Sequence, residues 1–237
     1  MKNFIIHEFD ELESTNQTAF ELANSRKIFD GEIILAKKQT AGKGRKGRSW
    51  SSPEGNLYFS MILQPKIDVK KIPQISFVAA VALKNTLEKL TSNISLKWPN
   101  DILINNKKCA GILLESKINQ QNCEFVILGI GVNIESNPDN TIFLATNLKD
   151  HKINIFTKDL LQNFLTEFNL IYQNWLDFGF ANIRNLWLNN AYKLKQEISI
   201  NLGDQKIDGI FIDLDMDGSL ILQQENQLQK ISVGDVS

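Results

Sequence analysis

Residues 33–63 read IILAKKQTAGKGRKGRSWSSPEGNLYFSMIL, which is two apolar segments joined by a long polar loop. Ile33–Ala36 and Leu57–Leu63 have the short apolar composition of buried strands. The loop between them formally matches the Gly-x-Gly-x-x-Gly dinucleotide fingerprint over Gly42–Gly47. That fingerprint needs a helix directly after its glycines, because the pyrophosphate then meets the helix N-terminus. A strand follows here instead, so the sequence argues against a Rossmann fold.

The same loop concentrates positive charge. Residues 37–48 contain six basic residues and no acidic residue, and glycines are interleaved with them. Glycine lets backbone amides approach an anion closely, and the basic side chains can neutralise that anion. The pattern therefore predicts a cradle for a phosphate or a carboxylate. A solvated basic loop that binds nothing is the alternative.

Outward from this loop, hydrophobic periodicity predicts further strands and helices of an α+β domain. Strands are expected at Phe4–Phe9, Ser95–Trp98, Ile102–Ile104, Cys109–Glu115 and Phe125–Asn133. Helices are expected at Asn16–Lys27, Ile72–Leu90 and Thr157–Asp177, with a helical continuation at Ile183–Ala191.

From about Lys195 the hydrophobic pattern changes from a helical period to alternation, which predicts a small β-barrel. Its expected strands are Ile198–Leu202, Lys206–Asp213, Ser219–Gln223 and Gln227–Val233. The pairs Gly203-Asp204, Asp217-Gly218 and Glu225-Asn226 predict the hairpin turns between them. We place the boundary after residue 190, which gives a catalytic domain at 1–190 and a small domain at 191–237.

Composition narrows the class of protein. The 237 residues carry 26 Lys+Arg and 27 Asp+Glu, and 43% are hydrophobic, which excludes collagen-like, coiled-coil and mostly disordered chains. This balanced charge argues against a protein that binds nucleic acid with its whole surface. Cys109 and Cys123 are too few for a disulfide framework, and with His7 and His151 they show no zinc-ligand spacing. We therefore expect a cytoplasmic protein, with apolar runs too short for a signal peptide or a membrane span.

Two further segments carry chemistry. In Lys97–Asp101 (KWPND), Lys97 points away from its neighbours Leu96 and Trp98, so one side of the strand can be core and the other a site. An edge-strand lysine is the alternative. Gly129–Asn133 (GIGVN) places two glycines on one strand face, where a planar ligand can lie against the backbone. A β-bulge is the alternative there.

Together and in this order, these segments resemble biotin protein ligases from about Ser14 to the C-terminus. The matching segments are Ser14–Asn16 (STN), Gln39–Trp50 (QTAGKGRKGRSW), Asn56–Ser60 (NLYFS), Lys97–Asp101, Lys108–Glu115 (KCAGILLE) and Gly129–Asn133. The resemblance implies a mixed, largely antiparallel sheet flanked by helices, with a small SH3-like C-terminal β-barrel. It also implies an activity: biotin and ATP give biotinyl-AMP and pyrophosphate, and biotin then passes to one lysine of an apo biotin carboxyl carrier protein, as in acetyl-CoA carboxylase.

The resemblance also assigns roles to residues. The biotin carboxylate and the α-phosphate of ATP are both anionic, so cations must screen their repulsion. Arg45, Arg48 and Lys97 match the positions that do so, and we expect them to be catalytic. The implied biotin-binding residues are Ser14, Thr15, Asn16, Gln39, Gly42, Lys43, Arg45, Lys97, Gly111, Gly129 and Gly131. The implied nucleotide-binding residues are Arg45, Arg48, Trp50, Asn100, Lys108 and Asn133.

Other expectations concern the metal, the loop and the partners. Mg²⁺ is expected with ATP, its ligands unassigned, and Asn100 and Asp101 match positions that place Mg²⁺ or the acceptor lysine. The family loop commonly has Arg where this chain has Lys43, which lacks a planar bidentate grip on carboxylate but keeps the charge. Because the first motif begins at Ser14, we expect the form without an N-terminal DNA-binding domain, which binds neither DNA nor membrane. A homodimer is compatible with the family.

Two alternatives stay open. A lipoate–protein ligase or octanoyltransferase shares the broad fold, and some such enzymes use a cysteine nucleophile. Cys109 lies on a motif strand, although its neighbours predict a small buried residue. A nucleic-acid-binding module would use the basic loop and the barrel. The barrel region is acidic, which weighs against this second alternative; its acidic residues include Asp204, Asp208, Asp213, Asp215 and Asp217.

Overall fold

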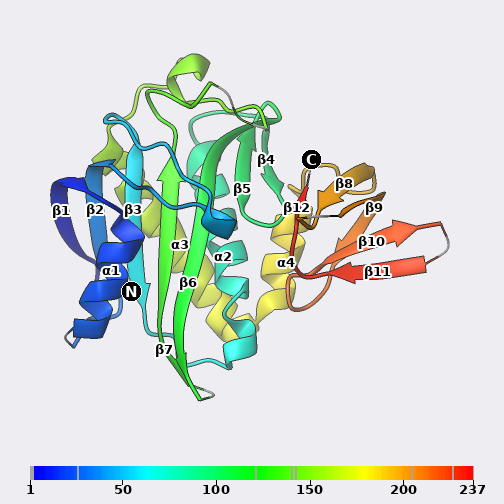
Figure 1. Ribbon diagram of the computed structural model, residues 1–237, viewed down its shortest axis with the longest axis horizontal. Coiled ribbons are helices and arrows are strands. Elements are labelled where there is room, and N and C mark those ends of the chain that lie inside the picture. The colour runs from blue at the N-terminus through cyan, green and yellow to red at the C-terminus, as the bar shows by residue number, and fades with distance from the viewer. Residues whose placement is uncertain are drawn as a thin grey trace.

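The computed structural model describes residues 3–25, 27–120, 122–139, 141, 143–203, 205–225 and 227–236. Within these residues the chain forms a seven-stranded sheet with helices on both faces, followed by a separate five-stranded sheet (Figure 1). This arrangement confirms the predicted α+β class. None of the helices in the described part of the chain combines the length and hydropathy that crossing a bilayer requires.

The large sheet is mixed and mainly antiparallel, as expected. In spatial order its strands are β1 (Ile5–Leu12), β2 (Glu32–Gln39), β3 (Leu57–Leu63), β7 (Asn122–Val132), β6 (Lys107–Asn119), β5 (Asp101–Ile104) and β4 (Ile94–Lys97). β1 and β2 are parallel, and the other neighbouring pairs in this described sheet are antiparallel. β4, which carries Lys97, is therefore an edge strand.

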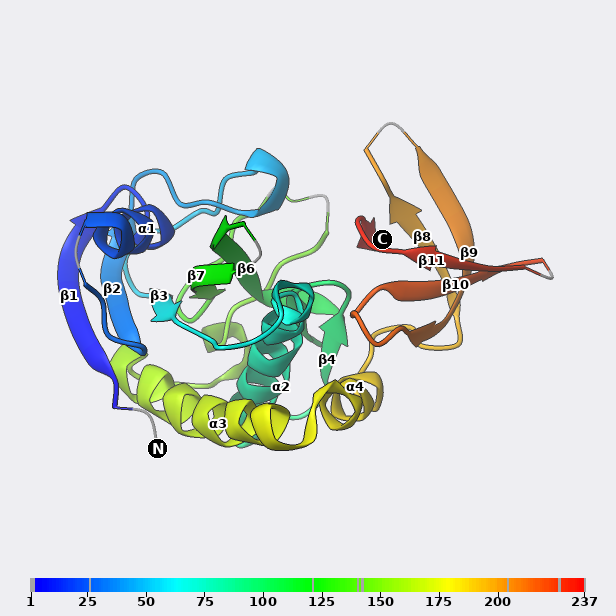
Figure 2. The same ribbon diagram turned by 90° about the horizontal axis from the view of Figure 1, so that it is seen from below.

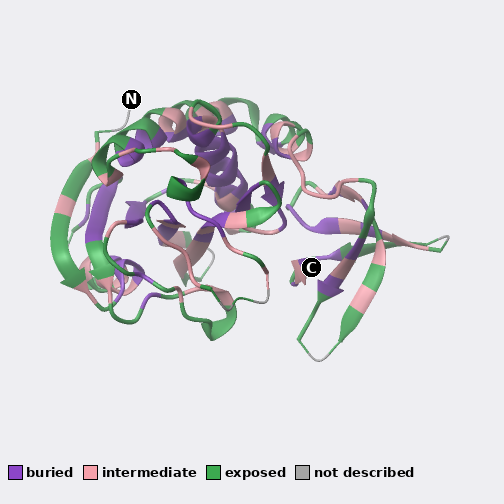
Figure 3. Cartoon of the chain, turned by 90° about the horizontal axis from the view of Figure 1, so that it is seen from above, coloured by how far each residue is buried: buried purple, intermediate pink, exposed green. Residues whose placement is uncertain are grey.

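Helices cover both faces of this sheet, as Figure 2 shows. They are α1 (Thr15–Ser25), α2 (Gln74–Glu88), α3 (Thr157–Phe178) and α4 (Phe180–Leu188). Alternate side chains of β2 point to opposite faces, so Ile34 joins the apolar cluster under α1 while Ile33 and Leu35 join the cluster under α2 and α3. Covered on both faces, β3 is buried along its whole length, whereas β1 is largely exposed (Figure 3).

The C-terminal sheet confirms the predicted small β unit. Its strands are β8 (Glu197–Asn201), β9 (Lys206–Leu214), β10 (Leu220–Gln224), β11 (Gln227–Ile231) and β12 (Asp235–Val236). They lie in the spatial order β11-β10-β9-β8-β12 and pair antiparallel. Phe211 of β9 packs against Trp187 of α4, with ring centroids 6.4 Å apart. This contact joins the small sheet to the helices.

The predicted elements lie within a few residues of the observed ones, with two main differences. β2 extends to Gln39 because it pairs with β1 there, so the loop begins at Thr40 and contains a short 3-10 turn, η1 (Arg45–Gly47). β12 was not predicted, because two residues are too short to show a period. The turn at Asp217-Gly218 is confirmed, with Gly218 at φ 85°. Asp204 and Asn226, in the other two predicted turns, lie outside the described residues.

Candidate functional site

A cavity of about 450 Å³ opens where the large sheet, the loop after β2 and the C-terminal sheet meet. We call residues 40–50 the basic loop. The cavity gathers almost every residue that the sequence singled out: Ser14, Thr15, Asn16, Gln39, Lys43, Arg45, Arg48, Trp50, Lys97, Asn100, Asp101, Lys108, Gly111, Gly129, Gly131 and Asn133. Their elements are far apart in the sequence, so the fold assembles the site.

One end of the cavity is lined by uncharged polar side chains at the start of α1. The Gln39 side-chain oxygen accepts hydrogen bonds from the backbone N–H of Thr15 at 2.8 Å and from its hydroxyl at 3.1 Å. The Ser60 hydroxyl lies 2.8 Å from Thr15 Oγ1 and 2.5 Å from Asn16 Oδ1. Asn16 Nδ2 donates to Glu115 Oε2 at 2.8 Å. These contacts fix the orientation of the amides and hydroxyls at this end of the cavity.

Glycines form a flat wall beside this network. Gly111 and Gly131 are paired across β6 and β7, and a Cβ on Gly131 would come within 2.6 Å of the Trp50 indole. A Cβ on Gly129 would overlap the Asn16 side chain. The ladders of β7 with β3 and β6 run without a shift through these glycines, so the β-bulge alternative is wrong. The glycines are needed because other groups pack directly on the strand backbone.

Trp50 covers the glycine wall at the base of the basic loop. Its indole packs against Gly111 and Gly131, and Lys108 Nζ lies 5.1 Å from the ring centroid. The indole Nε1 is buried and has no hydrogen-bond partner within the described residues. A buried donor without a partner costs about 1–3 kcal/mol, so the packing of Trp50 on the glycine wall must offset that cost.

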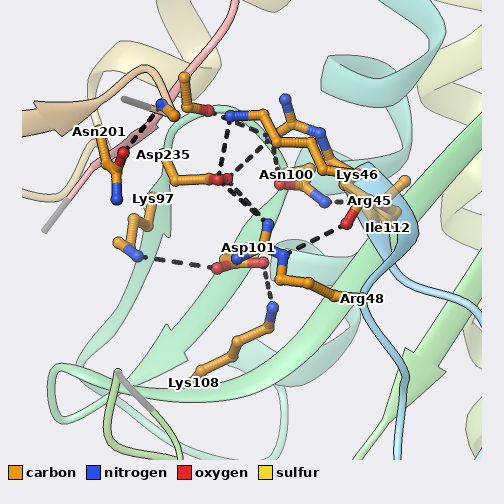
Figure 4. A network of polar contacts seen from close by, with 12 residues as sticks. Arg45, Lys46, Arg48, Lys97, Asn100, Asp101, Lys108, Ile112, Asn201 and Asp235 are labelled. Atoms are coloured by element: carbon orange, nitrogen blue, oxygen red, sulfur yellow. Dashed lines mark hydrogen bonds and ion pairs between the residues drawn. The ribbon is translucent and has the colours of Figure 1, made fainter. Parts of the chain in front are cut away.

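The other end of the cavity is charged. Lys97 is only 5% exposed, and its Nζ lies 3.8 Å from Asp101 Oδ2 (Figure 4). The same Nζ lies 3.8 Å from the centroid of the Phe143 ring. Lys108 Nζ contacts Asp101 Oδ1 at 2.6 Å. Burial lowers the pKa of Lys97, and the Asp101 carboxylate partly opposes that shift. A compact ammonium held in this partly dry place interacts strongly with an incoming anion.

The basic loop adds arginines at the cavity mouth. Arg45 Nη1 donates to Asn100 Oδ1 at 3.1 Å and lies 3.4 Å from Asp235 Oδ1. Arg48 Nη2 contacts the same carboxylate at 3.1 and 3.2 Å. Asn100 is itself fixed, because its Nδ2 donates to the backbone oxygen of Ile112. Burial lowers the pKa of Arg45, which still leaves a guanidinium that is charged at neutral pH.

Three predicted residues have structural partners. Gly42 does not line the cavity: a Cβ there would meet Ser52 Oγ and the Trp50 backbone oxygen, each at 2.5 Å, so this glycine lets the loop pack closely. Asn133 lines the cavity and donates from Nδ2 to the Thr146 backbone oxygen at 3.0 Å. Ser14 caps α1, since its backbone oxygen accepts from the Thr18 N–H at 3.0 Å.

Several lining or supporting residues were not identified from the sequence. They are Ser60, Glu115, Phe143, Asn201, Lys206 and Asp235. The last three come from the C-terminal sheet, where sequence reasoning placed no site residue. Glu115 ends the KCAGILLE segment, so its motif was visible although its contact with Asn16 was not.

The cavity has two carboxylates among its lining residues, Asp101 and Asp235. Among the described residues, no group of three or more His, Cys, Asp or Glu side chains is close enough to hold an ion. Mg²⁺ at nucleotide sites is usually bound by one or two carboxylates together with substrate phosphates. Asp101 and Asp235 lie at the cavity and meet that requirement.

Comparisons with known proteins agree with this geometry. The family model described as "Biotin/lipoate A/B protein ligase family" matches residues 8–133, and "Biotin protein ligase C terminal domain" matches residues 194–237. The bifunctional ligase/repressor BirA of Bacillus subtilis is 37% identical over 240 residues, covering 96% of this chain and 72% of that protein. The biotin–[acetyl-CoA-carboxylase] ligase of Paracoccus denitrificans is 35% identical, covering 94% of this chain and 96% of that protein.

A solved structure shares the fold. The biotin protein ligase from Aquifex aeolicus in complex with biotin and ATP superposes with a TM-score of 0.83 at 28% identity. The match covers 98% of this chain and 97% of that chain. It therefore includes both the large sheet and the C-terminal sheet.

Proposed function

This chain belongs to the biotin protein ligases of the biotin/lipoate A/B protein ligase family, and from that premise we propose how its residues divide the reaction. The enzyme activates biotin with ATP, which releases pyrophosphate, and then transfers biotin to a protein lysine. We propose that the uncharged end of the cavity binds the biotin ring system. The charged end binds the biotin carboxylate and the phosphates of ATP.

The observation that carries this proposal is the charge distribution within one cavity. In the described residues its lining has six cationic side chains and two carboxylates, an excess of four positive charges. The cations are Lys43, Arg45, Arg48, Lys97, Lys108 and Lys206. The network of Thr15, Asn16 and Gln39 at the other end carries no charge. A ligand with a neutral polar head and an anionic tail, joined to a polyphosphate, matches both ends.

At the uncharged end, the ureido group of biotin offers one oxygen acceptor and two N–H donors. Thr15, Asn16 and Gln39 hold hydroxyls and amides in fixed directions, so they can pair with all of these groups. Ser14 lies beside them on the cavity wall. Gly111, Gly129 and Gly131 let Trp50 and Asn16 pack directly on the strand backbone, and we propose that this packing shapes the pocket for a bicyclic ring.

At the charged end, the carboxylate attacks the α-phosphate, and Lys97, Arg45 and Arg48 screen the two anions. Their fixed positive charges also stabilise the charge that develops on the transferring phosphoryl group. Lys108 extends the same cationic surface, and Lys43 contributes its charge without a planar grip. Trp50 and Asn133 are proposed to contact the nucleotide base. Once biotinyl-AMP has formed, the residues that line the cavity exclude water from it.

Mg²⁺, when bound, neutralises phosphate charge. We propose that the Asp101 carboxylate, inside the cavity, is a ligand of that ion. Asp101 contacts Lys97 and Lys108, so it also fixes those two ammonium groups. Asn100 positions Arg45 through its side-chain oxygen. For the second half-reaction, we propose an apo biotin carboxyl carrier protein as the acceptor, with Asp101 close to the incoming lysine amine.

We also propose a domain organisation and a cellular location for this chain. We propose domains at 1–190 and 191–237, which is supported by the separate C-terminal sheet and by the second family match at 194–237. A cytoplasmic location is supported by the free cysteines Cys109 and Cys123. A homodimer remains part of the proposal as an expectation of the family.

A lipoyl- or octanoyl-transferring enzyme with a cysteine nucleophile is not favoured. Cys109 is fully buried in the core, and burial raises the pKa of its thiol to about 12. A thiol in that state has almost no thiolate at neutral pH and cannot act as a nucleophile. The relative from Paracoccus denitrificans and the solved structure from Aquifex aeolicus are both named as biotin ligases.

The test is isotope exchange between ATP and pyrophosphate, run in parallel with biotin and with lipoate. Adenylation is reversible, so exchange appears only with the acid that the enzyme activates. We expect biotin to support exchange and lipoate to leave it at background. Exchange with lipoate and none with biotin would overturn the proposal.

A further inference from the structure

A single carboxylate of the C-terminal sheet contacts several cations of the basic loop. Asp235 lies 3.1 Å from Arg48 Nη2, 3.4 Å from Arg45 Nη1 and 3.4 Å from Lys46 Nζ (Figure 4). Arg45 also donates to the neighbouring Gly234 backbone oxygen at 3.4 Å. The chain therefore brings its C-terminal strand to the segment that carries its most concentrated positive charge.

Asp235 itself sits on a fixed backbone. It pairs with Asn201 across β12 and β8, and the next residue, Val236, pairs with Ile200. Gly234 is packed so closely that a Cβ on it would lie 2.6 Å from the Ile200 side chain and 3.4 Å from Trp98. The carboxylate therefore projects from a position that has little freedom to shift.

The C-terminal sheet is in turn attached to the large domain at the β9–β10 end. Trp98 Nε1 donates to the Gly218 backbone oxygen at 3.0 Å, and Gln74 Nε2 donates to the Met216 backbone oxygen at 2.9 Å. Arg184 Nε donates to the Leu214 backbone oxygen at 2.6 Å. Trp98 directly follows Lys97 at the end of β4. The residue that attaches the C-terminal sheet is therefore next to the proposed catalytic lysine.

The basic loop is more exposed than this frame, because Lys43 and residues 46–49 are open to solvent. Its internal backbone hydrogen bonds join Gly44 to Arg48 at 2.7 Å and Trp50 to Gly42 at 2.8 Å. Arg45 and Arg48 repel each other, and Arg48 contributes to lowering the pKa of Arg45. A carboxylate between them offsets this repulsion and gives both guanidinium groups a common acceptor.

From this geometry we propose that Asp235 is a positioning residue for adenylation. It sets Arg45 and Arg48 at the cavity mouth before the phosphates of ATP arrive, so less loop ordering remains to be done on binding. The inference rests on the proposed roles of those arginines. It extends the site to a residue of the C-terminal sheet that the motif analysis did not assign.

The test compares Asp235→Asn with Asp215→Asn. Asp215 is a carboxylate of the same small domain that contacts Lys230, away from the cavity, so its substitution controls for loss of a surface charge. Without ligand, we expect the amides of residues 43–49 to exchange about tenfold faster in Asp235→Asn than in the control. We also expect the KM for ATP to rise about fivefold to tenfold, with the KM for biotin unchanged.

A double-mutant cycle locates the effect. If Asp235 acts through Arg48, Arg48→Gln and Asp235→Asn together raise the KM for ATP no more than Arg48→Gln alone. Unchanged loop exchange in Asp235→Asn, or a lower KM for ATP, overturns the inference. Amide hydrogen exchange of the loop is measured without substrates, so it tests the role of Asp235 independently of the reaction. Absence of biotin-dependent ATP–pyrophosphate exchange in the wild-type enzyme would instead contradict the proposed function.

Discussion

The two ends of the cavity are built in opposite ways. At the uncharged end, buried groups such as Ser60 of β3 and Asn16 of α1 hold one another by direct hydrogen bonds. At the charged end, cations such as the buried Lys97 and the exposed Arg48 are instead held by ion pairs with carboxylates from other elements. The difference indicates that one end recognises a fixed shape, whereas the other end changes its partners during the reaction. Substitutions at the two ends should therefore change different kinetic parameters: kcat at the charged end and the KM for biotin at the uncharged end.

The largest expected effect is at the charged end. Lys97→Gln should lower kcat for biotinyl-AMP formation by about 10²–10³-fold, because it removes a buried cation from the developing negative charge. Single-turnover release of pyrophosphate measures this step. Lys84→Gln is the matched control, since Lys84 is also buried but pairs with Glu88 on α2. Equal losses in both variants would contradict a direct role for Lys97.

Next in size is a substitution in the glycine wall. Gly129→Ala places a methyl group on the Asn16 side chain, and such overpacking costs about 1–3 kcal/mol. We expect the KM for biotin to rise about 10-fold to 100-fold, with kcat close to normal at saturating biotin. Steady-state kinetics with each substrate varied in turn separates the two. A change confined to the KM for ATP would mean that the two ends are assigned the wrong way round.

The pH profile sharpens the comparison at the charged end alone. Burial lowers the pKa of Lys97 from the ordinary 10.5, so its charged form is lost at a lower pH than for an exposed lysine. We expect kcat for adenylation to fall as the pH rises through that lowered pKa. The guanidinium of Lys97→Arg stays charged at higher pH than the ammonium of Lys97. The residual kcat of this variant should therefore decline at a higher pH than the kcat of the wild-type enzyme. An alkaline decline at the same pH in both enzymes would exclude Lys97 as its cause.

A smaller effect is expected within the buried network. Ser60→Ala leaves Thr15 and Asn16 without a shared partner, which should lower the free energy of unfolding by about 1–3 kcal/mol. The KM for biotin should rise a few-fold, and the KM for ATP should not change. Urea unfolding and steady-state kinetics measure the two effects. An unchanged KM for biotin would place this network outside the biotin site.

The smallest effect is expected at Cys109. Because burial raises the pKa of its thiol to about 12, alkylating reagents should not reach or react with it in the folded enzyme. Cys109→Ala should retain adenylation within about threefold. Mass spectrometry after alkylation, together with the exchange assay, checks both statements. Loss of activity with folding intact would return the cysteine-nucleophile alternative.

Sequence patterns predicted the parts of this molecule that depend on local composition. Glycines and cations in one loop indicated the charged end, and alternating residues placed Lys97 opposite Leu96 and Trp98, as the structure has them. The contacts of Asp235 and Phe143 could not be predicted, because they depend on how distant segments pack. Lys97 also shows the limit of the pattern: on an edge strand it could have been solvated, and Phe143 and Asp101 bury it.

The buried network shows a second limit. Ser14, Thr15 and Asn16 have the composition of a helix N-cap, and the Ser14 backbone oxygen does accept a helical hydrogen bond. Their other contacts reach Gln39 and Glu115 across the sheet. Residue type alone is the same for a helix cap and for a ligand-binding segment. Only the resemblance to a family therefore indicated that these residues belong to a binding site.

The most direct test of the account is biotin-dependent ATP–pyrophosphate exchange in Gly129→Ala and Lys97→Gln at rising biotin concentration. We expect saturating biotin to restore exchange in Gly129→Ala nearly to the wild-type rate and to leave Lys97→Gln inactive. Restoration of Lys97→Gln by biotin, with Gly129→Ala inactive at every concentration, would contradict the division of the cavity into a recognition end and a reaction end.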